Sequence, residues 1–197
     1  MEKRPYHHGD LKKDLIENGI KIINSEGISA LTMRKVAEMC HVSATAAYKH
    51  FKNKEDLMEA IRSDIAKDFS AYLESCLTNS DPRMQMLEIG IGYVKYMLAH
   101  KEYYYLMFCS ELNIEVTFEN GDFSYPEDSP FRVFYESAEA CISPHVPDSV
   151  LRHNKILMMW SEVHGIAGLL CNHVLKTTED IDRLVANMLL SVSNQIS

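Results

Sequence analysis

Polar and small side chains that suit contacts with DNA are concentrated between Thr32 and Phe51. Short hydroxyl, phenol and amine groups can donate hydrogen bonds to phosphates and base edges, whereas alanine can only touch a thymine methyl group. The spacing predicts two short helices joined by a tight turn at His41, with Ala47 and Phe51 on the inward face of the second helix. The outward face of that helix carries Ala44, Thr45, Tyr48 and Lys49.

Phosphate contacts are predicted from three cations in the same segment, Arg34, Lys49 and Lys54. Asn53 is an expected N-cap, which places Lys54 in the first turn of the following helix. Free amides and the positive end of the helix dipole can meet a phosphate there, and Lys54 adds a full charge. Two helices at a steep angle are typical of a helix-turn-helix in the major groove. A helical hairpin inside any all-α protein would produce the same spacing.

The segment from Thr32 to Leu57, which ends in VSATAAYKHFKNKEDL, resembles the DNA-binding domain of the TetR family of bacterial regulators. Two residues depart from the family pattern, because His41 and Thr45 stand where that family usually has Gly. The resemblance adds Thr32, Ser43 and His50 to the DNA-binding residues. The matching residues are Thr32, Val36, Ala37, Val42, Ser43, Tyr48, His50, Phe51, Lys54, Glu55 and Leu57.

The resemblance implies an all-α protein with two domains. Residues 1–63 would form a three-helix DNA-binding domain, and residues 64–197 a helical domain for ligand binding and dimerisation. The charge distribution agrees with this division. The chain has a formal net charge of -8, which is divided unevenly: residues 1–62 have a net charge of +2, and residues 63–197 have a net charge of -10. The acidic part is therefore expected to face away from DNA phosphates.

Two helices near the carboxyl end predict a homodimer through residues 149–175 and 178–196. The centre of the first, MMWSEVHGIAGLLC, has a single charged residue, Glu162, and apolar groups around most of its circumference. Such a helix must be buried on two sides, and a second copy of the chain would cover one of them. Gly165 and Gly168 would let that copy approach closely. Trp160, His164 and Gly165 form a W-x-x-x-H-G pattern that, with YHHGDL at residues 6–11, resembles one TetR subgroup.

The second domain is rich in methionine and tyrosine, which suit a pocket for a largely apolar or aromatic small molecule. The same residues could equally well fill a core. Glu162 stands out because a carboxylate among apolar residues needs a partner. The predicted ligand-binding residues are Tyr96, Tyr104, Met107, Phe108, Phe134, Met158, Glu162 and His164.

No metal site or cofactor is predicted. His164 and Cys171 are seven residues apart, but no further ligands accompany them. The sequence has no Gly-rich phosphate loop and no nucleophile elbow, so an enzyme is not expected. The five cysteines include no C-x-x-C pair, which is typical of reduced thiols in the cytoplasm. No membrane span or signal peptide is expected.

The segment 116–125 interrupts the helical pattern. Asn120-Gly121 predicts a short β-hairpin that pairs Phe118 with Phe123, with an irregular loop as the alternative. Taken together, the sequence predicts a homodimeric repressor that binds a palindromic double-stranded operator and is released by a small effector. Two alternatives are a DNA-binding protein of the same type controlled by a protein partner, and an enzyme with an accessory DNA-binding domain.

Overall fold

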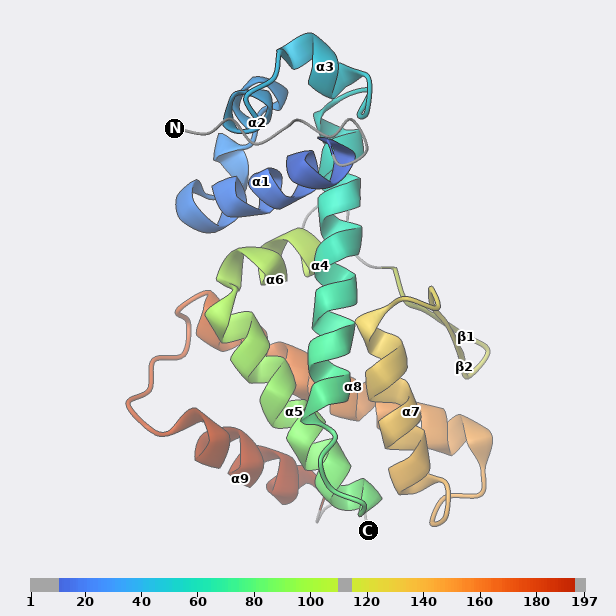
Figure 1. The fold of residues 1–197 in the computed structure, drawn as a ribbon. Coiled ribbons are helices and arrows are strands. Elements are labelled where there is room, and N and C mark those ends of the chain that lie inside the picture. The colour runs from blue at the N-terminus through green and yellow to red at the C-terminus, as the bar shows by residue number, and fades with distance from the viewer. Residues whose placement is uncertain (1–10, 110–114, 194–197) are drawn as a thin grey trace.

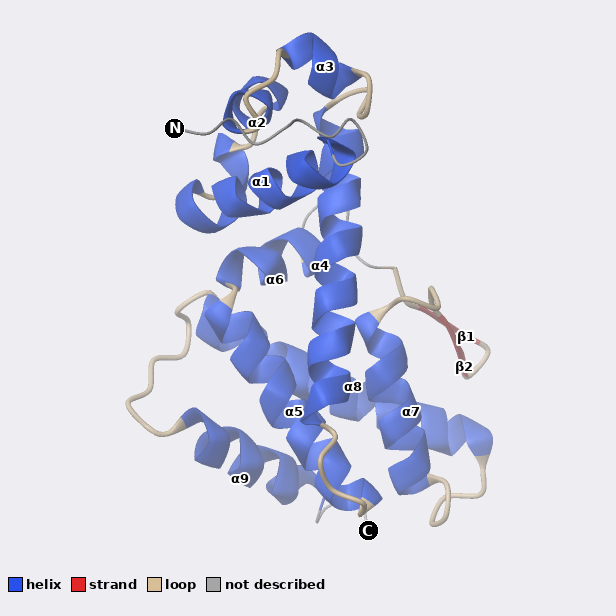
Figure 2. Ribbon diagram, in the orientation of Figure 1, coloured by secondary structure: helices blue, strands red, loops and turns tan. Residues whose placement is uncertain are grey.

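The computed structural model describes residues 11–109 and 115–193, and within these ranges the chain folds into nine α-helices, one 3-10 turn and a two-stranded hairpin (Figures 1 and 2). The prediction of an all-α fold is confirmed. The amino-terminal residues that belong to the YHHGDL pattern lie outside the described ranges, except for Leu11. No helix in the described ranges is long and apolar enough to cross a lipid bilayer.

The first three helices pack against the start of the fourth (Figure 1). The elements are α1 (Leu11–Glu26), the 3-10 turn (Ile28–Ala30), α2 (Met33–Met39), α3 (Ala44–Tyr48) and α4 (Lys54–Cys76). Their inward side chains, including Leu15, Ala47 and Ile61, are fully buried. Gly19 of α1 lies directly against Ile61 of α4, and an added Cβ would collide with that side chain. This glycine therefore permits the close contact of the two helices.

Helix α4 belongs to both halves of the molecule (Figure 1). Its first turns complete the amino-terminal core, and its last turns pack against α5 (Pro82–Ala99) and α7 (Pro130–Ile142). Phe69 is fully buried there, with its ring centroid 4.5 Å from that of Tyr96 and 5.2 Å from that of Tyr93. The helix continues through Ser63 without a break, and a domain boundary at this residue stays a prediction.

The carboxy-terminal helices surround α5, which contacts α4, α7, α8 (Ser149–Cys171) and α9 (Ile181–Ser193). The short helix α6 (Lys101–Phe108) lies between α1 and α8, beside α4 (Figure 1). Gly90 of α5 faces Leu189 of α9 so closely that a Cβ would collide with it. Burial on several sides explains why the sequence of α5 is apolar around much of its circumference.

Two helix ends differ from the sequence prediction. Helix α8 ends at Cys171 rather than Leu175, because His173 takes a left-handed conformation with φ 56° and the Leu175 amide donates to the Leu169 carbonyl at 2.9 Å. This closure is typical of a helix C-terminus, where glycine is the usual residue. Helix α9 begins at Ile181 rather than Thr178, since the Asp180 carboxylate accepts from the Arg183 amide. The predicted end of this helix at Ile196 lies outside the described residues.

The predicted hairpin is confirmed. Strands β1 (Thr117–Glu119) and β2 (Asp122–Ser124) are antiparallel, and Phe118 pairs with Phe123. Asn120 and Gly121 both have positive φ, as a two-residue turn of this kind requires. His153 of α8 bonds the Gly121 carbonyl at 2.8 Å through Nδ1 and the Tyr135 hydroxyl at 3.0 Å through Nε2. The buried imidazole thus attaches the hairpin to α7 and α8.

The predicted role of Gly168 at a dimer contact is wrong. A Cβ on Gly168 would lie 3.1 Å from Cζ of Tyr104 and closer still to its hydroxyl, so this glycine faces the core of its own chain. Gly165 has no atom within 4 Å of an added Cβ and faces open space. The two glycines are three residues apart, which corresponds to about 300° around a helix with 3.6 residues per turn, and they therefore lie on neighbouring but different faces.

Candidate nucleic-acid interface and effector site

Three side-chain caps position the helices that would meet DNA. The Thr32 hydroxyl accepts a hydrogen bond from the Lys35 amide at 3.2 Å, and the Ser43 hydroxyl accepts one from the Ala46 amide at 3.2 Å. The Asn53 side chain accepts from the Asp56 amide at 2.8 Å. The cap at Asn53 agrees with the sequence prediction. The hydroxyl protons of Thr32 and Ser43 stay available to donate to a phosphate, because each cap uses only the oxygen as acceptor.

Helix α3 presents the predicted reading residues on its outer side. Thr45, Lys49 and His50 are exposed, and the Tyr48 side chain is 52% exposed. Ala44 is half-buried, while Ala47 faces the core. The structure thus brings the predicted base-contacting residues onto α3 and the Lys49 cap at its carboxyl end, at one end of the molecule (Figure 1).

The predicted phosphate contacts surround this helix. Arg34 of α2 is exposed and pairs with Glu38 one turn later, with 2.8 Å between Nε and Oε1. Lys54 lies in the first turn of α4, half-buried, beside Glu55 and Asp56. Lys12 of α1, which sequence analysis did not select, places its ammonium 5.6 Å from the centre of the Phe51 ring. Lys12 follows the buried Leu11 and lies on the exposed, polar face of α1.

The turn between α2 and α3 is built on His41, which has φ 57°. A left-handed conformation costs an ordinary residue about 1–2 kcal/mol, whereas glycine adopts it freely. We expect His41→Gly to raise the free energy of unfolding by about 0.5–1 kcal/mol, because the larger entropy of the unfolded glycine chain offsets part of the relief. Urea unfolding measures this difference. His50→Gly is the matched control at a position without positive φ, and it should not stabilise. Equal effects of both changes would contradict strain at His41.

Three predicted effector residues lie together in the second domain. His164 of α8 has its ring centroid 5.1 Å from Tyr104 and 4.7 Å from Phe108, both on α6. The hydroxyl of Tyr104 lies 3.2 Å from Nε2 of His164, and the hydroxyl of Tyr93 lies 2.9 Å from Nδ1. Burial lowers the pKa of His164, so the imidazole is neutral near pH 7. Tyr93 and Trp160 also line this cluster, and sequence analysis did not select them.

The other predicted effector residues are dispersed. Tyr96 packs against Phe69 and the ring of His100, on the α4 side of α5. Phe134 is buried beside Phe131, and Met107 is fully buried. The side chain of Met158 is 56% exposed and lies away from these groups. Only Tyr104, Phe108 and His164 therefore share one site.

Helix α8 leaves an apolar stripe uncovered on its outer side, which we call the α8 stripe. Leu151, Met158 and Leu169 are exposed along it, and Gly165 lies between them with open space around it. Glu162 is half-buried on the same stripe, and this partial burial raises the pKa of its carboxyl group. Leu190 of α9 is exposed as well.

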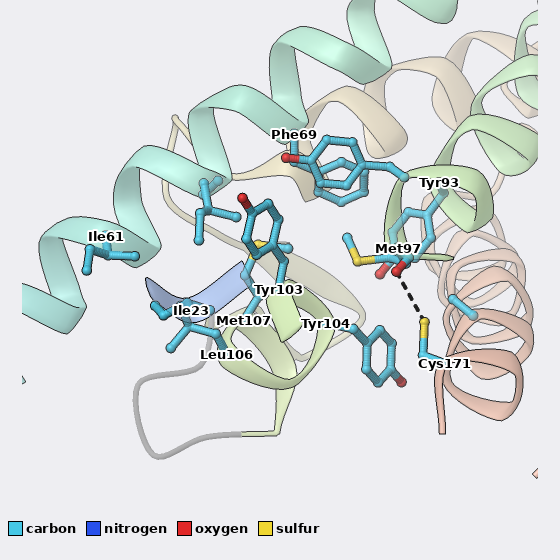
Figure 3. Close-up of a cluster of buried hydrophobic side chains, with 14 of the residues drawn as sticks. Ile23, Ile61, Phe69, Tyr93, Met97, Tyr103, Tyr104, Leu106, Met107 and Cys171 are labelled. Atoms are coloured by element: carbon cyan, nitrogen blue, oxygen red, sulfur yellow. Dashed lines mark hydrogen bonds between the residues drawn. The ribbon is translucent and has the colours of Figure 1, made fainter. Parts of the chain in front are cut away.

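Cys171 does not join His164 in a metal site. Its thiol donates to the Met97 carbonyl at 3.4 Å (Figure 3), while both ring nitrogens of His164 contact tyrosine hydroxyls. Among the residues with described positions, no group of three or more His, Cys, Asp or Glu side chains is arranged to hold a metal ion.

These features define an all-α protein with a capped helix-turn-helix at its amino-terminal end and an aromatic cluster in its carboxy-terminal half. Residues 15–61 match the model of bacterial regulatory proteins of the tetR family. Residues 86–192, more than half of the chain, match the tetracyclin repressor-like C-terminal domain. The chain belongs to the TetR family of bacterial regulators.

Individual relatives are similar over part of the chain or in fold. The tetracycline repressor protein class G of Vibrio anguillarum is 40% identical over 92 residues, which are 46% of this chain and 43% of that protein. The chain thus matches less than half the length of the curated relatives. A protein of unknown function from Rhodococcus sp. RHA1 has the same fold, with a TM-score of 0.74, 22% identity and 96% of both chains covered. The regulator FadR from Bacillus subtilis, solved with stearoyl-CoA, gives a TM-score of 0.58 at 13% identity, with 90% of this chain and 95% of that chain covered.

Proposed function

We propose that this protein is a transcriptional repressor that binds a palindromic operator as a homodimer and is released by a small effector. The observation that carries the proposal is the helix-turn-helix itself. Thr32, Ser43 and Asn53 cap the three helices around the turn, and α3 presents its hydroxyl, phenol and amine groups outward. An exposed helix of this kind suits the major groove. The acidic charge of the second domain is held away from this end.

The α8 stripe supports dimerisation. An exposed row of apolar residues that surrounds a glycine on one helix is self-complementary when a two-fold axis brings two copies together. Leu190 of α9 is a further exposed apolar residue near the carboxyl end of the described chain. A two-fold dimer presents two reading helices to two half-sites, and half-sites on straight DNA are ~34–36 Å apart. This spacing connects the shape of the dimer with the symmetry of the operator.

The aromatic cluster around His164 supports control by a small molecule. It joins aromatic surface with a few polar groups that converge, which is the usual composition of a ligand site. FadR from Bacillus subtilis, which shares the fold, was solved in complex with stearoyl-CoA, so a protein of this architecture can accept a small molecule. The protein must have one conformation that fits the operator and another that does not. An effector releases DNA only if its affinity is higher for the second conformation than for the first.

Selection of binding sequences from random double-stranded DNA tests the proposed function. We expect an inverted repeat whose half-sites are separated by about one helical turn. A set of selected sequences without any common motif would contradict an operator-binding role. The complex of protein and selected DNA should contain two chains, which sedimentation measures directly.

Replacement of Lys54 tests the proposed phosphate contact. The logarithm of the binding constant falls with the logarithm of salt concentration with a slope of about -0.9 for each phosphate neutralised. Lys54→Ala removes one contact from each half of a dimer, so we expect the slope to become shallower by about 1.8. Affinity should fall similarly for all DNA sequences. Fluorescence anisotropy across a range of salt concentrations measures both effects.

Lys176→Ala is the control, because Lys176 is an exposed lysine in the loop between α8 and α9, far along the chain from the helix-turn-helix. This variant should keep both the affinity and the salt slope. A Lys54→Ala protein that changes its base preference while its salt slope stays constant would show that Lys54 does not contact phosphate.

A further inference from the structure

Two consecutive tyrosines of α6 contact different domains. Tyr103 accepts a hydrogen bond from the Asn24 side chain of α1, with 2.9 Å between Nδ2 and the hydroxyl oxygen. Tyr104 lies against α8, where its hydroxyl meets His164. In Figure 3 the two rings leave the helix in different directions, with Tyr104 on the side of Cys171. Helix α6 therefore joins the aromatic cluster to the DNA-binding domain through adjacent residues.

The hydrogen bonds around His164 specify what the Tyr104 position accepts. The neutral imidazole carries one proton, and the buried Tyr93 hydroxyl needs an acceptor for its own proton. Both requirements are met when Tyr93 donates to Nδ1 and Nε2–H donates to the oxygen of Tyr104. The Tyr104 proton then points to the His164 carbonyl, which lies 3.5 Å away. The position therefore offers one donor and one acceptor to a single hydroxyl group.

The shape of the same position fits a flat ring. Gly168 has no side chain where the Tyr104 ring lies, and a Cβ there would be 3.1 Å from Cζ. Phe108 borders the ring with 5.6 Å between centroids, and His164 does so with 5.1 Å. Burial raises the pKa of Tyr104 to about 12, so its hydroxyl stays protonated near neutral pH. The slot between Gly168, His164 and Phe108 thus holds a neutral phenol supplied by the chain itself.

We propose that this slot, which we call the Tyr104 slot, is the recognition site for a phenolic effector whose ring and hydroxyl replace those of Tyr104. The inference rests on the proposed function and names the chemical class of its effector. A bound phenol would make the hydrogen bonds that Tyr104 makes with His164. The displaced Tyr104 would move α6, and with it the Tyr103 hydroxyl that Asn24 contacts. The effector thereby favours a different position of the DNA-binding domain.

The test uses p-cresol, which is the tyrosine side chain as a free molecule, and toluene, which lacks the hydroxyl group. Tyr104→Ala empties the slot, and Tyr105→Ala is the matched control because Tyr105 is 52% exposed. We expect p-cresol to bind Tyr104→Ala at least tenfold more tightly than the wild-type protein, where Tyr104 competes. Toluene should bind this variant at least tenfold more weakly than p-cresol, and Tyr105→Ala should behave as the wild type.

Calorimetric titration measures these affinities, and the fluorescence of Trp160 locates the binding. Trp160 is the single tryptophan, and its ring lies 5.9 Å from His164. A folded Tyr104→Ala protein without a gain in p-cresol affinity would overturn the proposal, and so would equal binding of toluene. If Tyr104→Ala does not fold, Tyr104→Leu opens the ring position while it keeps apolar volume on α6, and the same outcomes apply.

These titrations contain no DNA, so they are independent of the proposed function. A last measurement joins the two with the wild-type protein and its selected operator. Loss of operator affinity on addition of p-cresol is the expected result. An operator complex that is unchanged at saturating p-cresol would overturn the coupling through α6. A protein that binds no operator at all would instead contradict the proposed function. The p-cresol and toluene affinities would then still decide whether the Tyr104 slot binds a phenol.

Discussion

Gly165→Arg is expected to convert the proposed dimer into a folded monomer and to reduce operator affinity by at least about 10²-fold. This factor is the lower end of the gain in affinity that joining two binding modules supplies. Gly165 lies in the middle of the α8 stripe with open space around it, so a single chain can accommodate the arginine. In the dimer the same side chain would clash with the opposing helix and bring a charge into a mostly apolar contact. Sedimentation at micromolar concentration measures the change.

Two further variants make this test specific. Gly165→Ala adds a single methyl group and should keep a substantial dimer fraction. Gly168→Arg should instead destabilise the monomer, because Tyr104 already occupies the space beside Gly168. A folded Gly165→Arg protein that stays fully dimeric would show that the α8 stripe is not the interface.

Phe69→Ala is expected to lower the free energy of unfolding by about 3–5 kcal/mol, the usual cost of removing a buried phenylalanine ring. Phe69 is fully buried where α4 meets α5, with aromatic contacts to Tyr93 and Tyr96. Guanidinium unfolding measures the loss. Tyr105→Ala, at an exposed position on α6, should change the stability by no more than about 0.5 kcal/mol. A Phe69→Ala protein that loses less than about 1 kcal/mol would contradict a close-packed junction.

Local physical chemistry made the amino-terminal third predictable. Each N-cap side chain accepts a hydrogen bond from the backbone amide three residues later, so donor and acceptor lie in the same short stretch of sequence. The three N-caps are Thr32, Ser43 and Asn53. The hairpin was predictable for the same reason, since Asn120-Gly121 supplies the backbone conformation of its turn. His41 takes a left-handed conformation, which glycine adopts most easily, and the TetR family usually has glycine at this position.

The orientation of α8 was not predictable, because a helix that is apolar around most of its circumference has no periodicity to distinguish its faces. Gly168 was therefore assigned to the wrong face, and Met158 was grouped with His164 although it lies on the outer stripe. The cluster around His164 depends on contacts between residues 60 and 71 positions apart in the chain. Spacing within one helix cannot reveal such contacts.

The unbroken course of α4 has a mechanical consequence. Its 23 residues, at 1.5 Å each, form a lever about 34 Å long, whose first turn lies close to α3 and whose last turns pack against α5 and α7. A tilt of roughly 6° about the far end displaces the near end by about 3.6 Å, which is close to the 3.4 Å rise of one base pair. Two symmetric levers double that displacement between half-sites. In the proposed dimer, a tilt of this size moves each reading helix by about one base pair relative to the operator.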